Sequence, residues 1–214
     1  MKKYKLAALV AAVSMAALGT AHANTVIGSV WENVPGIASD ATIANEPGTT
    51  PDATFTLGTP FDLDSTVGAN GYTIGGYLAS NPGGFSWLTG SGISGDPLDN
   101  SYWFFTGQIT VTNGEVFHVE HDDGLQLNIG GTLVVDQPGP TSAEDTPYTW
   151  NGLSGTYAFT LSYGECCGPP AVLATDLPLS SGAPEASTWA MMIAGFCGLG
   201  FAGFRASRRR EAIA

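Results

Sequence analysis

Apolar and polar residues alternate in short runs through the second half of the chain, with glycine-rich turns between the runs. Leu125–Ile129 has the period of two that is typical of a half-buried strand, and Gly155–Tyr163 places its aromatic and leucine side chains on one face. The dipeptide Asn113-Gly114 is a strong hairpin signal between Trp103–Val111 and Val116–His121. Many short strands without helical periodicity predict an antiparallel sandwich or barrel.

The remaining pattern is less regular. Thr25–Trp31 and Ala53–Leu57 are expected to be strands, whereas residues 35–52 and 138–147 are expected to be loops because they contain many turn-forming residues. Residues 80–95 are expected to form a surface segment rich in Gly and Ser, and Ala171–Leu179 is expected to close the domain. We therefore expect an all-β fold over residues 24–182, with a single antiparallel domain that is a sandwich or resembles a jelly roll.

Charge is distributed very unevenly along the 214 residues. All seven Lys and Arg residues lie within residues 2–5 and 205–210, and 17 of the 19 acidic residues lie between residues 24 and 182, the other two being Glu185 and Glu211. The formal charge of this central part, the body, is therefore −17. Such a body repels phosphate and has no cation to neutralise it, which excludes nucleic acid as a partner. It attracts metal cations instead.

The N-terminus has the pattern of a secretory signal peptide over residues 1–23. Met1–Lys5 is positively charged, Leu6–Leu18 is apolar, and Ala21-His22-Ala23 is a small-x-small cleavage site. We expect cleavage between Ala23 and Asn24 after recognition by the general secretion machinery.

The C-terminus carries three segments in a fixed order over residues 183–210. A short polar segment precedes an uncharged apolar run at residues 189–204, and an Arg-rich tail follows at residues 205–210. The run is long enough for a helix of about 24 Å, so we expect a transmembrane helix with its basic end in the cytoplasm. Cys197 lies in this run and is expected to act as a small apolar residue.

This arrangement resembles the PEP-CTERM sorting signal, in which a Pro-Glu-Pro element, an apolar helix and a basic tail occur in this order. The resemblance implies processing by an exosortase in a Gram-negative cell that exports exopolysaccharide, and a final place at the cell surface or in the biofilm matrix. Ala186 stands where the family usually has proline. The residues that carry the resemblance are Pro184, Glu185, Ala186, Arg208, Arg209 and Arg210.

Residues 102–173 resemble the protective-antigen-type β-sandwich, the PA-fourteen domain. The matching features are an aromatic strand ending near Gly107, the Asn113-Gly114 turn, the run from Asp122 to Val134 that opens with Asp-Asp-Gly, and the Tyr-ending strand Gly155–Tyr163. Members of this family are often accessory or adhesive modules. The resemblance implies that paired Asp residues and the loop after the Tyr-ending strand hold a calcium ion, which in turn contacts sugar hydroxyls.

Asp122, Asp123 and Glu165 are accordingly the candidate calcium ligands. Calcium takes 6–8 oxygen ligands, and Gly124 permits the unusual backbone that two adjacent carboxylates need to reach one ion. Glu165 stands where the sugar-binding relatives carry Asn. The alternative is that Asp-Asp-Gly is a turn in which the carboxylates bond backbone amides.

Other residues offer secondary hypotheses. Tyr148 and Trp150 are candidate stacking platforms for a sugar. Cys166 and Cys167 can form a vicinal disulfide, an intermolecular bridge or free thiols. His118, Glu120 and His121 could suggest zinc, but His121 does not share a face with the other two on a regular strand, so a solvated face is the default.

We therefore expect a non-catalytic, exported protein whose body binds carbohydrate or acts as an adhesion module with the help of Ca²⁺. One alternative is a purely structural surface protein without a specific ligand. Another is an ice-binding surface protein, which requires a flat array of threonines; Thr49-Thr50 and Thr54-x-Thr56 do not form one in the sequence.

Overall fold

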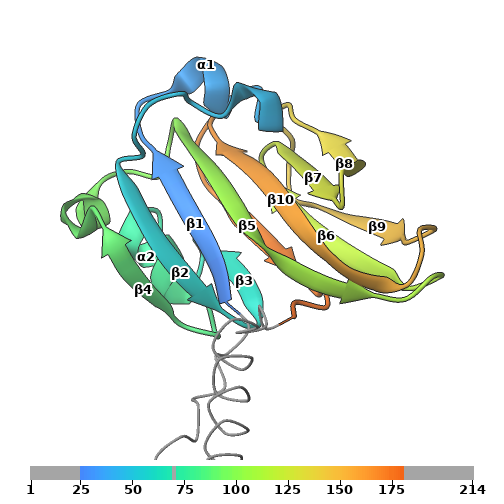
Figure 1. Cartoon of the computed structure of the whole chain (residues 1–214). Helices are drawn as coiled ribbons and strands as arrows, with labels where there is room; N and C mark the ends of the chain where they lie inside the picture. Colours follow the sequence, from blue (N-terminus) through green and yellow to red (C-terminus); the bar gives the residue numbers. More distant parts are fainter. Residues whose placement is uncertain (1–24, 69–70, 181–214) are drawn as a thin grey trace, which may run out of the picture. The chain divides into compact units, whose positions relative to one another are not determined.

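The computed structural model describes residues 25–68 and 71–180, and these form two antiparallel sheets packed face to face as a sandwich (Figure 1). The described residues all belong to one compact unit. The larger sheet has seven strands in the order β4 (Phe85–Thr89), β2 (Ala53–Gly58), β1 (Thr25–Trp31), β5 (Ser101–Val111), β10 (Gly155–Glu165), β7 (Leu125–Ile129) and β8 (Thr132–Gln137).

The smaller sheet has four strands in the order β3 (Phe61–Asp64), β11 (Val172–Thr175), β6 (Val116–Asp122) and β9 (Glu144–Thr149). Strand β11 pairs with β3 on one side and with β6 on the other. The chain crosses from the smaller to the larger sheet at the end of β6, where Asp122, Asp123 and Gly124 lead into β7.

Four short helical turns connect the strands: α1 (Pro35–Ala38), η1 (Ile43–Asn45), α2 (Ile74–Ser80) and η2 (Ser91–Gly95). Helix α2 begins after Thr73, whose hydroxyl accepts a hydrogen bond of 3.1 Å from the Gly76 amide as an N-cap. Tyr77 and Leu78 of this helix are fully buried, so α2 contributes to the core although it is only seven residues long.

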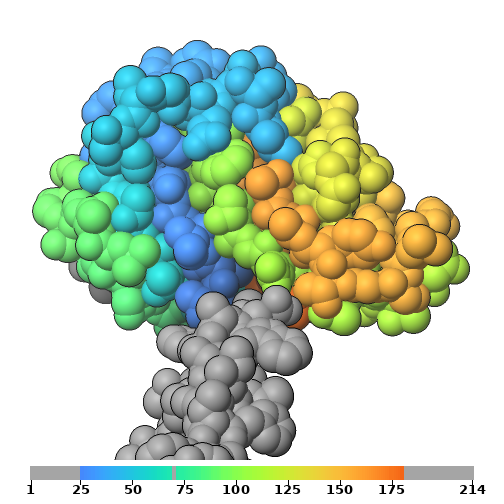
Figure 2. All heavy atoms as spheres, viewed as in Figure 1, coloured from blue at the N-terminus to red at the C-terminus, as the bar shows by residue number. Residues whose placement is uncertain are grey.

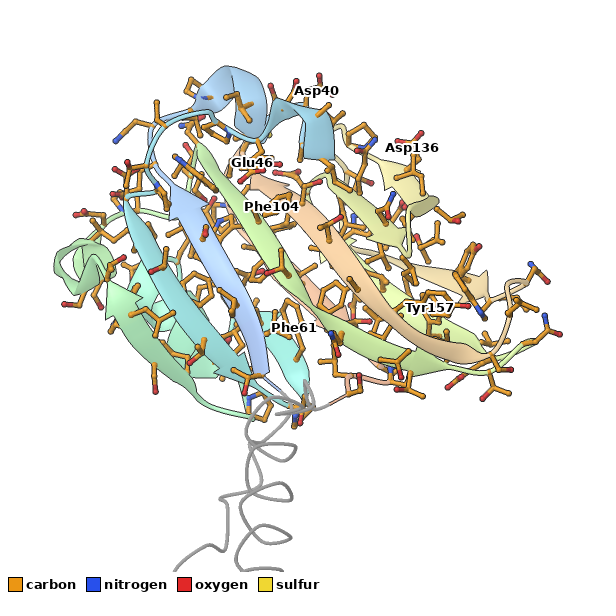
Figure 3. All side chains as sticks on the ribbon, viewed as in Figure 1. Asp40, Glu46, Phe61, Phe104, Asp136 and Tyr157 are labelled. Carbon is orange, nitrogen blue, oxygen red and sulfur yellow. A yellow bond between two sulfur atoms is a disulfide. The ribbon has the colours of Figure 1, made fainter. Side chains whose placement is uncertain are left out.

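The segment of α1 and η1 covers the upper end of the outer face of the seven-stranded sheet (Figures 1 and 2). Ala41 packs with Trp31 and Tyr102 in a small cluster that Phe104 borders, and Figure 3 labels Phe104 on β5 at the edge of this cover. The Ser162 hydroxyl donates to the Ala41 carbonyl at 2.6 Å. Below this cover the outer face is open to the viewer in both figures.

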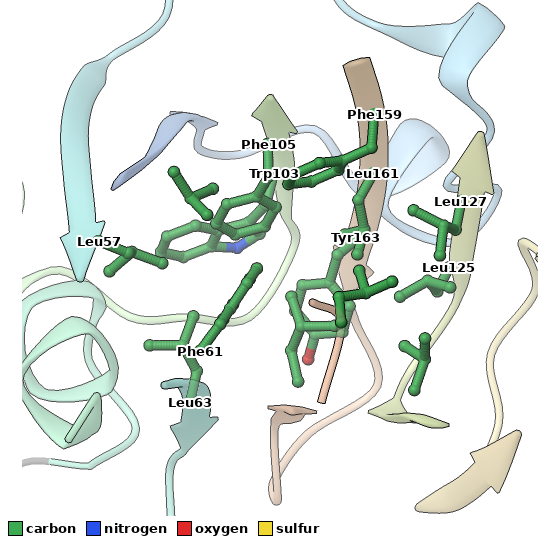
Figure 4. Close-up of a cluster of buried hydrophobic side chains, with 14 of the residues drawn as sticks. Leu57, Phe61, Leu63, Trp103, Phe105, Leu125, Leu127, Phe159, Leu161 and Tyr163 are labelled. Atoms are coloured by element: carbon green, nitrogen blue, oxygen red, sulfur yellow. The ribbon is translucent and has the colours of Figure 1, made fainter. Parts of the chain in front are cut away.

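The core lies between the two sheets and is rich in aromatic side chains (Figure 4). Trp103 is fully buried at its centre, with Phe55 and Phe105 at ring distances of 5.7 and 6.2 Å. Strand alternation supplies these side chains, because every second residue of β2, β5 and β10 points inward. The inward aromatic face expected for residues 157–163 is confirmed.

The predicted strands near residues 25–31, 53–57, 103–111, 116–121, 125–129 and 155–163 are confirmed. The hairpin predicted at Asn113-Gly114 is wrong, because this turn carries the chain from β5 in the larger sheet to β6 in the smaller one. The predicted loop at 138–147 is wrong in part, because β9 begins at Glu144; it is a polar edge strand in which Pro147 is tolerated. Strand β4 lies inside residues 80–95, which were expected only to be a surface segment rich in Gly and Ser, and β3 and α2 were not predicted. Each is seven residues or shorter, which leaves little periodicity to detect.

The signal peptide at residues 1–23 and the sorting segment at residues 183–210, with its apolar run at 189–204, lie outside the described residues. Among the residues that are described, no helix is both long and apolar enough to cross a membrane.

Candidate cation site at the Asp122–Asp123 corner

The candidate site lies where the chain passes between the two sheets. Asp122 ends β6, the Asp122–Asp123 peptide bond is cis, and Gly124 leads into β7. A side chain at Gly124 would collide with the carbonyl of Pro138, so only glycine allows the loop after β8 to approach this closely. The sequence Asp-Asp-Gly thus brings two carboxylates to the β8–β9 loop.

The two aspartates border a cavity of about 390 Å³. Three segments far apart in the sequence line it: the end of β6, the loop before β9 and the loop after β10. Its lining residues are Asp122, Asp123, Pro140, Thr141, Ser142, Cys167, Gly168, Pro169 and Pro170.

Both aspartates are buried and already accept hydrogen bonds. Asp123 is 4% exposed, and its Oδ2 accepts from the Cys166 amide at 2.9 Å, with a further backbone bond from Thr141. Asp122 is 7% exposed and accepts from the Ala143 amide. Burial raises the pKa of both carboxyls above their usual range, and the backbone amides partly offset this effect. The carboxylates therefore connect the two flanking loops to the end of β6.

His121 supports this corner from inside the sandwich. The side chain is fully buried, and its Nδ1 donates to the carbonyl oxygen of Asp123 at 2.6 Å. Its Nε2 lies 2.8 Å from Oε1 of Gln137. His118 and Glu120 instead point to the outside of β6, where His118 Nδ1 pairs with Asp145 at 2.9 Å. The face separation expected for the possible zinc ligands is confirmed, and the three side chains do not converge.

Glu165 is not beside the two aspartates in the cavity. It is the last residue of β10, and its register points it inward like Tyr163, so the carboxylate is fully buried. The Tyr72 and Tyr163 hydroxyls donate to its two oxygens at 2.8 and 2.7 Å. The pKa of Glu165 is raised to about 8, mainly because the carboxyl group is buried. The two tyrosine hydrogen bonds oppose this shift, and the charges of Asp123 and Asp122 add to it.

The expected set of Asp122, Asp123 and Glu165 is therefore not assembled. Among the described residues, only Asp123, Cys166 and Cys167 bring three metal-ligand atoms of His, Cys, Asp or Glu within 4.8 Å of one another. The two cysteine sulfurs form a vicinal disulfide and are not thiolate ligands. Cys167 has a positive φ of 72° and turns the loop toward the cavity.

The cavity nevertheless offers the oxygen chemistry that calcium prefers. Asp122 and Asp123 supply carboxylates, Thr141 and Ser142 carry hydroxyls, and residues 167–170 of the loop after β10 complete the lining. Pro169 and Pro170 have no amide hydrogen, so this part of the wall is rich in acceptors. A donor set of carboxylates, hydroxyls and carbonyls fits a hard cation. Asp122 and Asp123 would hold such an ion, and its charge would supply an anchor for ligand hydroxyls.

Neither aromatic sugar-platform candidate lies at this cavity. Trp150 is only 4% exposed and belongs to the core, and its Nε1 donates to the Leu153 carbonyl at 2.9 Å. Tyr148 is half-buried against Phe117, with ring centroids 5.3 Å apart. Because Phe117 lies at the opposite end of β6 from Asp122, Tyr148 is remote from the corner. Because Tyr148 and Trp150 lie next to a predicted loop in the sequence, we expected their side chains to be exposed. In the structure both pack against the core.

No protein-family model and no curated protein matches the chain. Among solved structures, it is similar to a PA14 sugar-binding domain from an RTX adhesin, with 20% identity, a TM-score of 0.49 and coverage of 75% of this chain and 93% of that one. It is also similar to the PA14 domain of the MpAFP antifreeze protein, with 17% identity, a TM-score of 0.49 and coverage of 76% and 84%. Similarities of this strength assign neither a family nor a ligand to the chain.

Sequence reasoning missed the partners of Glu165 and the residues that line the cavity with the two aspartates. Tyr72, Thr141 and Ser142 lie in segments without a motif, and they meet the corner only through the sandwich packing. The one available signal was the run Gly168-Pro169-Pro170, which marks a constrained loop directly after the Tyr-ending strand.

Proposed function

We propose that the body is a non-catalytic, calcium-dependent carbohydrate-binding or adhesion module. The observation that carries this proposal is the pair Asp122 and Asp123, buried at a cavity that Thr141, Ser142 and residues 167–170 also line. A body with a charge of −17 and no Lys or Arg between residues 24 and 182 favours cation binding further.

The proposal includes export and sorting. The signal peptide with cleavage at Ala23–Asn24 and the segment Pro184–Ala186 with its Arg tail support recognition by the secretion machinery and by an exosortase. The polymer available to such a protein at the surface of a Gram-negative cell is exported exopolysaccharide. Edman sequencing of the exported protein tests the first step, with Asn24 expected as the new N-terminus.

Calcium titration by calorimetry tests the site itself. Binding to residues 24–182 should raise the melting temperature over that in chelator, because an ion that binds only the folded state stabilises it. Asp122→Asn and Asp123→Asn should abolish the heat of binding. Asp62→Asn is the matched control, since Asp62 is an exposed carboxylate on β3 away from the cavity.

A glycan array in calcium and in chelator then tests the ligand. We expect retention that requires calcium and is lost in both aspartate variants. Absence of calcium binding at millimolar concentration would refute the site.

A purely structural role is the second candidate, and one observation favours it. Backbone amides of Thr141, Ala143 and Cys166 already bond the two carboxylates, as expected for a turn that only joins loops. In that case Asp123→Asn would lower the melting temperature equally in calcium and in chelator.

A further inference from the structure

The outer face of the seven-stranded sheet gathers uncharged hydroxyl side chains from strands that are distant in the sequence. Strand pairing aligns one residue from each of six strands in a continuous row across the sheet. In order from β4 to β7, the row consists of Ser86, Thr56, Ile27, Thr106, Thr160 and Asn128. At the spacing of neighbouring strands it is about 24 Å long.

The six residues of the row are exposed or half-buried, and Figure 2 shows the face of the seven-stranded sheet with α1 and η1 at its upper end. Ile27 is 51% exposed although it belongs to β1, a central strand with a neighbour on each side. Among the described residues, the hydroxyls of Thr106 and Thr160 make no hydrogen bond, whereas the Thr56 hydroxyl donates to the Ser86 carbonyl at 3.5 Å and Asn128 Oδ1 accepts from the Gly131 amide at 2.9 Å. The row therefore offers free hydroxyls and methyl groups to a ligand.

The charge of this surface is distinctive in so acidic a body. From β4 to β7, the outward positions of the sheet carry no Asp or Glu, and the first carboxylate is Asp136 on the edge strand β8. An anionic polymer would be repelled by the surrounding charge of −17, and a cationic partner would find no carboxylate to pair with on the row. The complementary partner is uncharged.

The row continues into a hollow of about 250 Å³ at the β2–β4 end. Thr25, Thr56, Ser86 and Phe85 line it together with three glycines. Phe85 packs against the core and Trp87, so the hollow presents mainly hydroxyls and backbone groups without any charge, which can hydrogen-bond the hydroxyls of a neutral sugar.

The twist of the sheet favours a flexible partner over a rigid, flat one. Neighbouring strands rotate by about 20–25° relative to each other, so five steps turn the row through roughly 100°. A flat crystal plane can contact only part of such a surface, whereas a flexible chain can follow it.

We propose that this row is a second binding surface, which holds an uncharged polysaccharide chain across β4, β2, β1, β5, β10 and β7 without calcium. It is independent of the calcium site proposed above, because the row and the cavity at Asp122 and Asp123 share no residue.

The test is native affinity electrophoresis of residues 24–182 in EDTA, through gels that contain hydroxyethyl cellulose, dextran or galactomannan. Alginate serves as the anionic comparison. At least one neutral polymer should retard the protein, and alginate should not. Ile27→Asp should weaken retardation at least tenfold. Thr106→Val and Thr160→Val keep the shape but remove a hydroxyl, and each should weaken it about fivefold.

Val116→Asp is the matched control, because Val116 is also β-branched, is 54% exposed and lies on the smaller sheet. It should leave retardation unchanged, as should Asp123→Asn, which separates this surface from the calcium site. Circular dichroism melting checks that Ile27→Asp is folded.

Three outcomes would overturn the proposal. The first is migration unaffected by every neutral polymer. The second is thermal hysteresis that Ile27→Asp abolishes, which would assign the row to ice. The third is a dimer, seen by light scattering, that Ile27→Asp dissociates, which would assign it to a second copy of the chain.

Discussion

The Asp122–Asp123 corner and the outer row of the seven-stranded sheet are built on opposite principles. At the corner, three carboxyl groups lie buried within one connected set of hydrogen bonds, and the Tyr163 hydroxyl lies within hydrogen-bond distance of both the Asp122 carbonyl and Glu165. On the row, no side chain titrates, and the side-chain groups are hydroxyls, methyls and one amide, with the Thr106 and Thr160 hydroxyls unpaired among the described residues. The corner should therefore respond to protons and cations, and the row should respond to neither.

The largest expected difference is in pH dependence. The pKa of Glu165 is about 8 in the folded state against 4.5 in the unfolded chain. Between these values the folded state keeps a proton that the unfolded state releases, so the free energy of unfolding falls as pH rises from about 4.5 to 8. Each pKa unit corresponds to about 1.4 kcal/mol, which sets an upper limit of roughly 4–5 kcal/mol.

Glu165→Gln removes the titrating group and retains a hydrogen-bonding side chain between the two tyrosines. Urea unfolding in chelator should show a much flatter pH profile for this variant than for the wild type. Identical profiles for the two proteins would mean that Glu165 is not the group responsible.

Asp123→Ala should cause the next largest change, a loss in the free energy of unfolding. Its comparison with Thr160→Ala tests the corner against the row directly. The substitution leaves the buried amide of Cys166 and the amide of the half-buried Thr141 without their acceptor, which should cost about 3 kcal/mol. Thr160→Ala on the row should change the free energy of unfolding by less than about 0.5 kcal/mol. Equal losses in urea unfolding would show that the corner is not a hydrogen-bonded centre.

Reduction of the Cys166–Cys167 disulfide should lower the stability of the fold only slightly, but it should also disturb the Asp122–Asp123 corner. It closes a very short loop, so reduction should lower the free energy of unfolding by about 1 kcal/mol. Because the Cys166 amide bonds Asp123, reduction should also weaken calcium binding. Mass spectrometry of the unreduced protein should give a mass lower by two hydrogen atoms, whereas two alkylated thiols would contradict the bridge.

The smallest expected effect is on the row. Retardation by a neutral polysaccharide in chelator should be constant between pH 5 and 9, since no side chain of the row titrates there. A clear pH optimum in electrophoresis would mean that ionisable groups outside the row contribute to binding.

The sequence identified strands better than it identified neighbours. Alternation located β5, β6, β7 and β10 because it is a local signal. The hairpin predicted at Asn113-Gly114 is wrong, because the strands on either side of this turn, β5 and β6, lie in different sheets. The edge strand β9 escaped because its side chains are polar on both faces. The inward register of Glu165 could be read from its even spacing after Phe159, Leu161 and Tyr163, yet its position in the family resemblance suggested a ligand.

The outer row shows most clearly why some features of the structure could not be predicted from the sequence. Thr56, Thr106 and Thr160 are separated by about 50 residues each, and only the order β2-β1-β5-β10 brings them into line. In the sequence, Thr54-x-Thr56 formed no array. Cross-strand alignment is a property of register and topology, which local patterns do not encode.

The position of β11 has a consequence for the order in which the chain can fold. This last strand lies between β3 and β6, and β3 has no other strand beside it in its sheet. During synthesis, Phe61–Asp64 must therefore wait until Val172–Thr175 has been made before it gains its partner. Such distant pairing slows folding, since the intervening chain must be ordered first. A chain that stops before Val172 loses the neighbour of β3 and one neighbour of β6 together.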